Sequence, residues 1–511
     1  MKQVLAPATS TGDAGLAAST VYSYAVRAVD NAGNASGMST TVSTNTPTCS
    51  VVGTGQLGWA KRWGGTGTDV GQAVATDGSG NVLVGGSFSG TVDFGTGALS
   101  GGTGGAFLAK YAPDGTAVWS RVMSGTGNAR VLGIAVDRSG NVVTTGYLVG
   151  SVNFGGGTLT SAGAYDIFVA EYSATNGFVW AKRFGTSGNL GSQQGNGVAF
   201  DANGDVLVTG TFNTSITFGG ATLSTLGGGH GMFVTKLAGA TGAHVWSKNL
   251  VSFSESFGSG VTVDGGGNAL AVGYYKGSVI FGGTTYTNAG ASDIVLAKYG
   301  AASGTELWIK HFGGPNDDLG TGIAVDLRCI GGSNVNVVCA NDAQCPGSTC
   351  GSVVIAGEFY GIGLNFGGGN AFTSSFNDVF VAKYAVADGA YIWAKHPAGP
   401  SSWENATGVA VDSAGDIGVA GNFTASIDFG GGALTSSGAE NAFVAKLSGA
   451  SGAQVWARIF QDTGSSAGTA VAIGGNRNVV MTGWFVGTGN FGGATLTTAG
   501  STDIFVVDLT P

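Results

Sequence analysis

Histidine, the side chain that most often moves protons near neutral pH, is scarce in this sequence. The four His residues are His230, His244, His311 and His396, and their spacing predicts no Ser/His/Asp or Cys/His arrangement. His311 and His396 each follow a Trp-x-Lys motif, in a position held elsewhere by Arg62 and Arg183. A structural role is therefore predicted for these His residues, and no catalytic residue is assigned.

Six Asp residues recur where a short apolar segment ends and a turn begins: Asp77, Asp137, Asp201, Asp264, Asp326 and Asp412. The stretch from Asp201 to Asp205 is the best local match to a calcium loop. Calcium loops need more oxygen ligands at set spacing, whereas Asp before x-x-Gly usually accepts an N–H group of its own turn. Turn formation is favoured and no metal ligand is assigned. Calcium is the one cofactor that these residues leave open.

Four of the five Cys residues fall close together, at Cys329, Cys339, Cys345 and Cys350. Zinc sites usually contain C-x2-C pairs; this cluster has none, and no His lies nearby. Two disulfides are therefore predicted in preference to a metal site, with three connectivities open. Disulfides persist in oxidising compartments, which predicts a secreted or cell-surface protein. Cys49 has no predicted partner.

The elements that would position these residues repeat along the chain. A hydrophobic-Trp-x-basic motif recurs at intervals of 60 to 66 residues, apart from one interval of 85. Its Trp residues are Trp59, Trp119, Trp180, Trp246, Trp308, Trp393 and Trp456. Each of the seven units has four strand-like segments, a pattern that predicts an all-β, seven-bladed β-propeller of four-stranded antiparallel blades. The long interval contains a Cys-rich insertion at 327–352, between the first and second strands of the fifth unit.

The phase of the repeat predicts how the ring closes. The repeating part begins with the Trp59 strand and ends on a third strand, DIFVVDL, after which no Trp strand follows. Residues 57–63 are therefore expected to pair with residues 503–509 and complete the last blade, which removes an open sheet edge.

The units resemble those of the bacterial seven-bladed β-propeller (SBBP-type) repeat family, through GGPNDDLGTGIAVD at 313–326 and AVDRSGNVVTTG at 135–146. The resemblance covers about 450 residues and implies the fold. It implies little about activity, because such repeats occur mainly in large secreted or surface proteins without assigned chemistry.

The N-terminal part does not follow the repeat. Residues 1–46 resemble the last two strands of a fibronectin type III domain, with Tyr22 and Tyr24 on an alternating strand. A complete domain needs roughly 100 residues, so a fragment of a longer protein is favoured over a separate strand pair. Residues 47–56 are predicted to be a linker and 57–511 the propeller. The first residues contain no signal peptide, which carries little weight if the N-terminus is truncated.

Composition limits the partners. Of 511 residues 97 are Gly, only 10% are charged, and the formal net charge is -9. The basic residues follow the repeat, and the five Lys residues of the third strands are expected to hold their charges in water: Lys110, Lys236, Lys298, Lys383 and Lys446. No basic patch for nucleic acid is predicted, and no apolar run is long enough for a membrane span. The sequence does not indicate an oligomeric state.

The best hint of function lies in the loops from fourth to first strands, which differ most between units. They contain Trp63, Asp69, Asp317, Asp318, Trp403 and Glu404, which are expected to break the repeat. Aromatic rings beside carboxylates suit sugar or peptide binding. The sequence favours a non-catalytic extracellular or cell-surface module that binds a glycan or protein. A polysaccharide-active hydrolase or lyase with its site at the channel mouth is the alternative, and ordinary variable loops would explain the same residues.

Overall fold

The structure is a computed structural model that describes residues 21–24, 35–45, 55–187, 193–329, 339, 344–345, 350–397, 399, 403–437 and 440–511. The chain divides into two compact units, Met1–Thr54 and Gly55–Pro511. In the first unit, β1 (Val21–Tyr24) pairs antiparallel with β2 (Val42–Asn45). The fibronectin type III likeness stays a prediction, and Cys49 lies outside the described residues.

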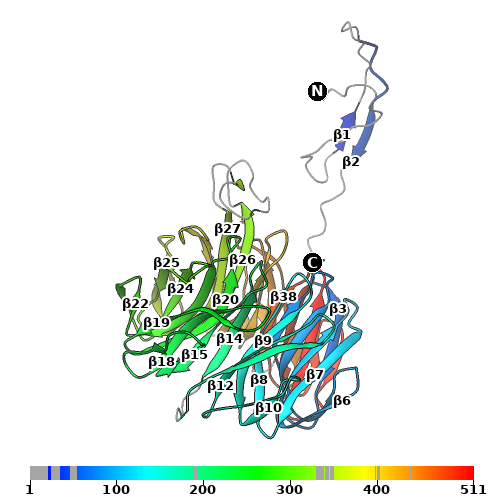
Figure 1. Ribbon diagram of the computed structural model, residues 1–511. Coiled ribbons are helices and arrows are strands. Elements are labelled where there is room, and N and C mark those ends of the chain that lie inside the picture. Colours follow the sequence, from blue (N-terminus) through cyan, green and yellow to red (C-terminus); the bar gives the residue numbers. More distant parts are fainter. Residues whose placement is uncertain are drawn as a thin grey trace. The chain divides into compact units, whose positions relative to one another are not determined.

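The second unit is a seven-bladed β-propeller of four-stranded antiparallel blades, as the repeat predicts (Figure 1). The first strands, innermost in the ring, are β4 (Val70–Thr76), β8 (Asn128–Val136), β14 (Gln194–Phe200), β20 (Glu255–Val263), β26 (Asp318–Cys329), β32 (Glu404–Val411) and β38 (Ser466–Ile473). They define blades 1 to 7. The second strands are β5 (Val82–Asp93), β9 (Val142–Val149), β15 (Val206–Asn213), β21 (Ala269–Lys276), β27 (Cys350–Phe359), β33 (Ile417–Phe423) and β39 (Val479–Phe485).

The outer half of each blade consists of a third and a fourth strand. The third strands are β6 (Ala98–Tyr111), β12 (Asp166–Tyr172), β18 (His230–Leu237), β24 (Asp293–Tyr299), β30 (Asp378–Ala385), β36 (Asn441–Leu447) and β42 (Asp503–Leu509). The fourth strands are β7 (Ala117–Gly125), β13 (Phe178–Phe184), β19 (His244–Ser252), β25 (Glu306–Phe312), β31 (Tyr391–Lys395), β37 (Gln454–Asp462) and β3 (Leu57–Trp63).

Six short hairpins occupy the connections from second to third strands. They are β10 (Ser151–Asn153) with β11 (Thr158–Thr160), β16 (Ser215–Ile216) with β17 (Leu223–Ser224), β22 (Ser278–Phe281) with β23 (Thr284–Thr287), β28 (Ile362–Asn365) with β29 (Ala371–Thr373), β34 (Ser426–Ile427) with β35 (Leu434–Thr435), and β40 (Thr488–Asn490) with β41 (Thr495–Thr497). Three of them pair with the fourth strand of the preceding blade and so cover part of its edge.

The ring closes through β3, which pairs with β42 in the register Trp59↔Asp508 and Trp63↔Ile504. The predicted closure is thus confirmed. A second link closes the ring near its axis. Thr469 Oγ1 in blade 7 donates a hydrogen bond of 2.6 Å to the carbonyl of Gly71 in blade 1. Thr469 is the extra residue of a β-bulge between Gly468 and Ala470, and a bulge re-aims a side chain in this way.

Five of the seven repeat Trp residues join neighbouring blades through a hydrogen bond. The Nε1–H groups of Trp59, Trp180, Trp246, Trp308 and Trp393 each donate to a backbone carbonyl in the turn between the third and fourth strands of the next blade. Each bond satisfies an indole N–H while the ring fills the space where blades diverge. The motif that reveals the repeat in the sequence therefore also holds consecutive repeats together.

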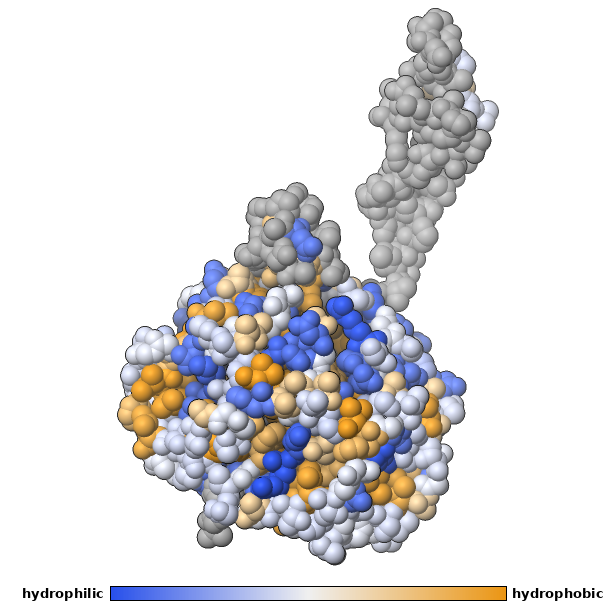
Figure 2. Space-filling view, in the orientation of Figure 1, coloured by the Kyte–Doolittle hydropathy of each residue, from blue (hydrophilic) through white to orange (hydrophobic). Residues whose placement is uncertain are grey.

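Two faces of the propeller are distinguished by their connections. The loop face carries the connections from second to third and from fourth to first strands. The turn face carries the connections from first to second and from third to fourth strands, including the Cys-rich insertion of blade 5. In the surface view, apolar residues form small groups between polar ones (Figure 2). Among the described residues, no helix has the length and apolarity needed to cross a membrane.

Candidate functional site

Trp63 does not lie on a binding surface. The side chain is 7% exposed and stacks on Tyr111 with a centroid distance of 4.5 Å. It stands four residues after the repeat Trp59, where other units carry buried apolar residues such as Met123, Phe184 and Phe460. Trp63 therefore follows the repeat, and the expectation of an exposed stacking surface there is wrong. The regular spacing from the repeat Trp is the sequence signal that identifies this position.

Asp69, Asp318 and Glu404 are also repeat positions. Strand registers place each of them two residues before the residue that pairs with the second-strand Gly of its blade, and all three are fully buried. Asp69 accepts hydrogen bonds from the N–H groups of Gly65 at 2.7 Å and Ser89 at 3.1 Å. Asp318 accepts one from Gly314 at 2.6 Å. Asp69 and Asp318 therefore fix the loops that contain them, and the expectation that these three residues break the repeat is wrong.

Asp318 should make the stability of the protein depend on pH. Burial, with smaller effects from Asp293 and Asp317, raises the pKa of Asp318 to about 7. In the unfolded chain an Asp ionises near pH ~4. The neutral form is thus favoured on folding, so its stabilising effect is complete below pH ~4 and is lost as the pH rises through about 7.

We expect Asp318→Asn to flatten the decline of the free energy of unfolding between pH 4 and pH 7, measured by urea titration at several pH values. The amide cannot ionise but can still accept the N–H of Gly314. Asp388→Asn is the control, because Asp388 is exposed, lies in a turn on the opposite face and accepts the N–H of Ala390 at 2.9 Å. An unchanged pH profile in Asp318→Asn would contradict the argument.

Asp317 and Trp403 are exposed and lie in one set of linked loops on the loop face. Trp403 is 61% exposed. The N–H of Tyr360 donates to the carbonyl of Asp317 at 3.1 Å, and that of Glu404 to the carbonyl of Asn377 at 2.8 Å. Asn377 Nδ2 donates to Glu358 at 3.0 Å. These bonds tie the loops of blades 5 and 6 together and keep Trp403 and Asp317 in a fixed framework.

Three further exposed apolar side chains lie in the same loops, namely Tyr360, Ile362 and Phe376. We call these three residues, with Trp403 and the carboxylates Asp317 and Glu358, the blade 5–6 patch. Burial and then the charge of Asp317 raise the pKa of Glu358, while the bond from Asn377 lowers it. The patch combines apolar area with negative charge, and the sequence analysis identified two of its six members.

A second set of side chains lies at the loop-face end of the second strands, directly after the strand Gly; five of them are half-exposed, and Ser87 and Thr211 are buried. The residues at this position are Ser87, Tyr147, Thr211, Tyr274, Glu358, Asn422 and Trp484. Some have aromatic contacts across the face, such as Tyr274 stacked on Phe257 at 4.8 Å. The sequence signal for this set is a residue that varies between blades inside an otherwise regular second strand. These positions are not among the predicted site residues.

The recurrent Asp and Lys residues form buried ion pairs. In blade 1 the Nζ atom of Lys110 lies 2.8 Å from Asp77, and four other blades repeat this contact between the third strand and the end of the first. All five Lys residues are buried, so the expectation that their charges lie in water is wrong. The Asp residues also accept N–H groups of their turns, as expected.

The His residues have structural partners, as their place in the repeat indicates. His396 Nε2 lies 2.7 Å from Asp378, in the arrangement that Arg183 forms with Asp166 at 2.5 Å and Arg62 forms with Asp503. His311 Nδ1 lies 3.3 Å from the hydroxyl of Tyr275. His230 lies 3.2 Å from Glu255, and His244 lies 3.1 Å from Ser247.

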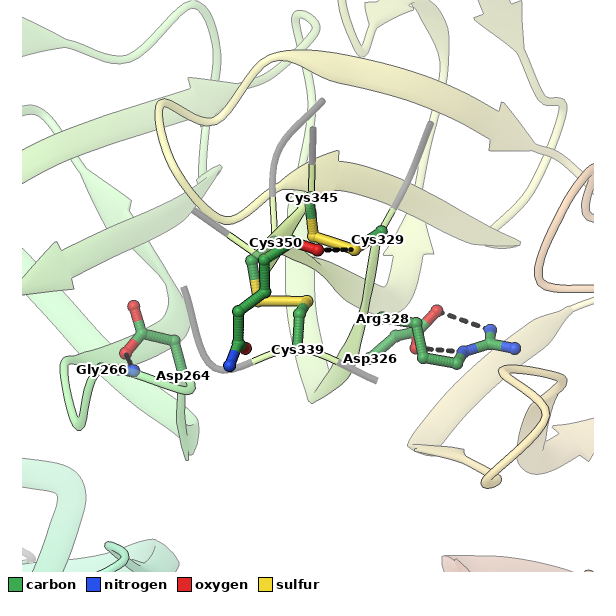
Figure 3. The surroundings of a disulfide bond; sticks show 9 residues. Asp264, Gly266, Asp326, Arg328, Cys329, Cys339, Cys345 and Cys350 are labelled. Atoms are coloured by element: carbon green, nitrogen blue, oxygen red, sulfur yellow. Dashed lines mark hydrogen bonds and ion pairs between the residues drawn. A yellow bond between two sulfur atoms is a disulfide. The ribbon is translucent and has the colours of Figure 1, made fainter. Parts of the chain in front are cut away.

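The four clustered Cys residues form two disulfides, Cys329–Cys345 and Cys339–Cys350. Figure 3 shows the two bonds next to each other, between the turn of Asp264 and the ion pair of Asp326 with Arg328. The three sulfurs of Cys329, Cys339 and Cys345 also lie close enough for a metal, but paired sulfurs are not thiolate ligands. Much of the insertion lies outside the described residues.

Two cavities lie in the propeller, one beside the Cys-rich insertion and one beside the closing strand β3. One, of about 460 Å³ on the turn face, is lined by Asp137, Phe200, Asp264, Cys339 and Gln344 among others. The other, of about 600 Å³, lies beside the closing strand and is lined by Gln56, Leu57, Arg458, Phe460 and Gln461 among others. Neither lining contains a His residue, and carboxylates line the smaller cavity alone.

Comparisons with known proteins bear on the fold. No protein-family model matches the chain. The uncharacterized WD repeat-containing protein L264 of Acanthamoeba polyphaga mimivirus is 27% identical over 161 residues, which cover 27% of this chain and 11% of that protein. The chain therefore spans about a tenth of the curated relative that it matches.

Solved structures align over most of the ring at low identity. The WD40 domain of Neurospora crassa Pan2 aligns with a TM-score of 0.42 and 9% identity, over 88% of this chain and 95% of that one. The WD40 propeller of Doa1 aligns with a TM-score of 0.41 and 12% identity, over 88% and 96%. At these values the comparisons assign neither a family nor an activity, and the resemblance to the bacterial repeat family stays a prediction.

Proposed function

We propose that this propeller is a non-catalytic recognition module whose blade 5–6 patch binds a protein segment that carries apolar and basic side chains. The observation behind the proposal is the exposed apolar group of Tyr360, Ile362, Phe376 and Trp403 beside the carboxylates Asp317 and Glu358. Apolar side chains supply contact area, and carboxylates favour a cationic partner over an anionic one. The net charge of -9 acts in the same direction.

Binding is favoured over catalysis because the groups that could move protons are used by the fold. His396 is held by Asp378 and His230 by Glu255. The buried acids Asp69 and Asp318 hold their loops in place. An acid–base mechanism needs such groups to converge on one reacting atom, and the exposed patch offers aromatic and aliphatic surface instead.

The same proposal includes a secreted or cell-surface location, which the two disulfides of the insertion support because such bonds persist in oxidising compartments. A neutral glycan is the competing ligand class, since exposed aromatic rings also stack on sugars.

Selection of a displayed random peptide library on the intact protein tests the proposal. We expect enrichment of peptides that combine Lys or Arg with large apolar residues. The selected peptide should bind Trp403→Ala at least tenfold more weakly, whereas Leu307→Ala, which removes an exposed side chain from the outer strand β25, should leave binding unchanged. Equal binding to both variants, binding of neutral glycans alone on an array, or turnover of a polysaccharide would overturn the proposal.

A further inference from the structure

In blades 1, 3, 4, 5 and 6, a cation occupies the same internal position. The Nζ atom of the third-strand Lys lies between 2.7 and 3.1 Å from the Asp that ends the first strand. In three of these blades the ammonium also donates to a carbonyl of the next blade, for example Lys298 to Val386 at 2.9 Å. That carbonyl accepts the Nε1–H of the repeat Trp as well, here Trp308 at 3.2 Å.

Blade 2 departs from this pattern because Glu171 stands where the other blades have Lys. The register is the same, since Glu171 lies opposite Val143 and Trp180 as Lys110 lies opposite Leu83 and Trp119. The first strand of blade 2 still ends in an acid, Asp137. Two carboxylates therefore face the position at which a carboxylate and an ammonium meet in the other blades.

The oxygens around this position are not all satisfied by the protein. Glu171 is 6% exposed, and its Oε2 atom is buried without a hydrogen-bond partner. The carbonyl of Gly239, in blade 3, accepts Trp180 Nε1–H at 2.6 Å. Among the described residues it accepts no Lys ammonium, whereas the equivalent carbonyls of Val386 and Gly449 each accept one. An unpartnered buried carboxylate oxygen costs free energy unless a proton or cation compensates it.

We propose that blade 2 binds a calcium ion between Asp137 and Glu171, with the carbonyl of Gly239 as a third ligand, in the place of the Lys ammonium of the other blades. The charges favour a divalent ion. In blades 1 and 4 one ammonium pairs with one carboxylate, whereas blade 2 has two carboxylates and no Lys at this position, so an ion of charge +2 would balance both. All the available ligands are oxygens, which calcium prefers, and water completes its coordination.

The surroundings provide both support and access. Asp137 Oδ1 accepts the N–H groups of Ser139 and Asn141, each at 2.8 Å, and Oδ2 accepts Asn141 Nδ2 at 2.8 Å. The carboxylate is thus held in one orientation before the ion arrives. Asp137 also lines the turn-face cavity of about 460 Å³, through which water and ions can reach it.

A proton is the competing occupant. Burial, followed by the charge of Asp137, raises the pKa of Glu171 to about 7. In the absence of calcium, Glu171 is then largely protonated below neutral pH, and calcium must displace that proton. Calcium affinity should therefore rise between pH 6 and pH 8.

Isothermal titration calorimetry tests the proposal. The full chain is first treated with EDTA to remove bound metal and is then titrated with calcium chloride. We expect one site per chain and a Tm that rises with calcium concentration. Glu171→Gln should weaken calcium binding at least tenfold. Glu171→Lys, which restores the ion pair of the other blades, should abolish binding and make the Tm independent of calcium.

Blade 7 supplies the matched control. Asp508 also replaces the third-strand Lys, but Gly474 replaces the acid at the end of the first strand, and Asn478 donates to Asp508 at 2.6 Å. Asp508→Asn should therefore retain calcium binding. No calcium binding by the wild type, equal binding by Glu171→Lys, or equal stabilisation by potassium chloride at the same ionic strength would overturn the proposal.

Discussion

A chain that begins at residue 66 is expected to lose its cooperative thermal transition, whereas a chain that begins at residue 55 keeps it. The longer chain retains β3, which completes blade 7 by pairing with β42. Without β3, the strand β42 becomes an open edge and the buried residues Ile504 and Val506 lose their packing against Trp63. Thermal unfolding followed by circular dichroism, with size-exclusion chromatography for aggregation, measures the difference.

A single substitution isolates the contribution of β3 to packing. Trp63→Ala should lower the free energy of unfolding by about 3–5 kcal/mol, because it empties a buried site. Trp403→Ala changes the same residue type at an exposed position and should change stability by about 0.5 kcal/mol or less. Similar losses in the two variants, or equal stability of the two truncated chains, would show that the ring does not depend on this strand.

Lys298→Met is expected to destabilise the protein by about 3–5 kcal/mol at pH 7, because it leaves the Asp264 carboxylate buried without its cation. Lys298 Nζ lies 2.8 Å from Asp264, and both side chains are buried. The variant also removes the donor to the carbonyl of Val386, which joins blade 4 to blade 5. Urea unfolding measured by tryptophan fluorescence gives the loss.

The double variant Lys298→Met with Asp264→Asn should recover part of the stability, since no buried charge is then unpaired. Lys276→Met is the control. Lys276 is more exposed and lies 3.5 Å from Glu255, so its loss should cost about 0–1 kcal/mol. Equal losses for Lys298→Met and Lys276→Met would contradict the importance of the buried pairs.

The sequence predicts the ring, the phase of its closure and the cluster of two disulfides, because each depends on spacing along the chain. The repeat Trp residues mark every blade, and the missing Trp strand after 503–509 is found at Trp59. The disulfide connectivity needed the structure, because three pairings satisfy the same spacing.

The candidate site was harder to predict, because equivalence between blades depends on strand register. Asp69, Asp318 and Glu404 share one position with Ala129, Gln193, Ser256 and Ser466. Because these residue types differ and the preceding loops differ in length, the sequence does not show that the seven positions are structurally equivalent. The Lys–Asp pairs were missed for a related reason: each partner follows its own regular pattern, and only the folded sheet brings third strand and turn together.

The ring buries some of the unusual loop residues and leaves others exposed in the blade 5–6 patch. Titration of one selected basic peptide against the wild type, Trp403→Ala and Leu307→Ala, at two salt concentrations, tests this division most directly. We predict at least tenfold weaker binding to Trp403→Ala, unchanged binding to Leu307→Ala, and weaker binding at high salt because Asp317 and Glu358 contribute. Peptide binding that is independent of Trp403 and of salt would contradict it.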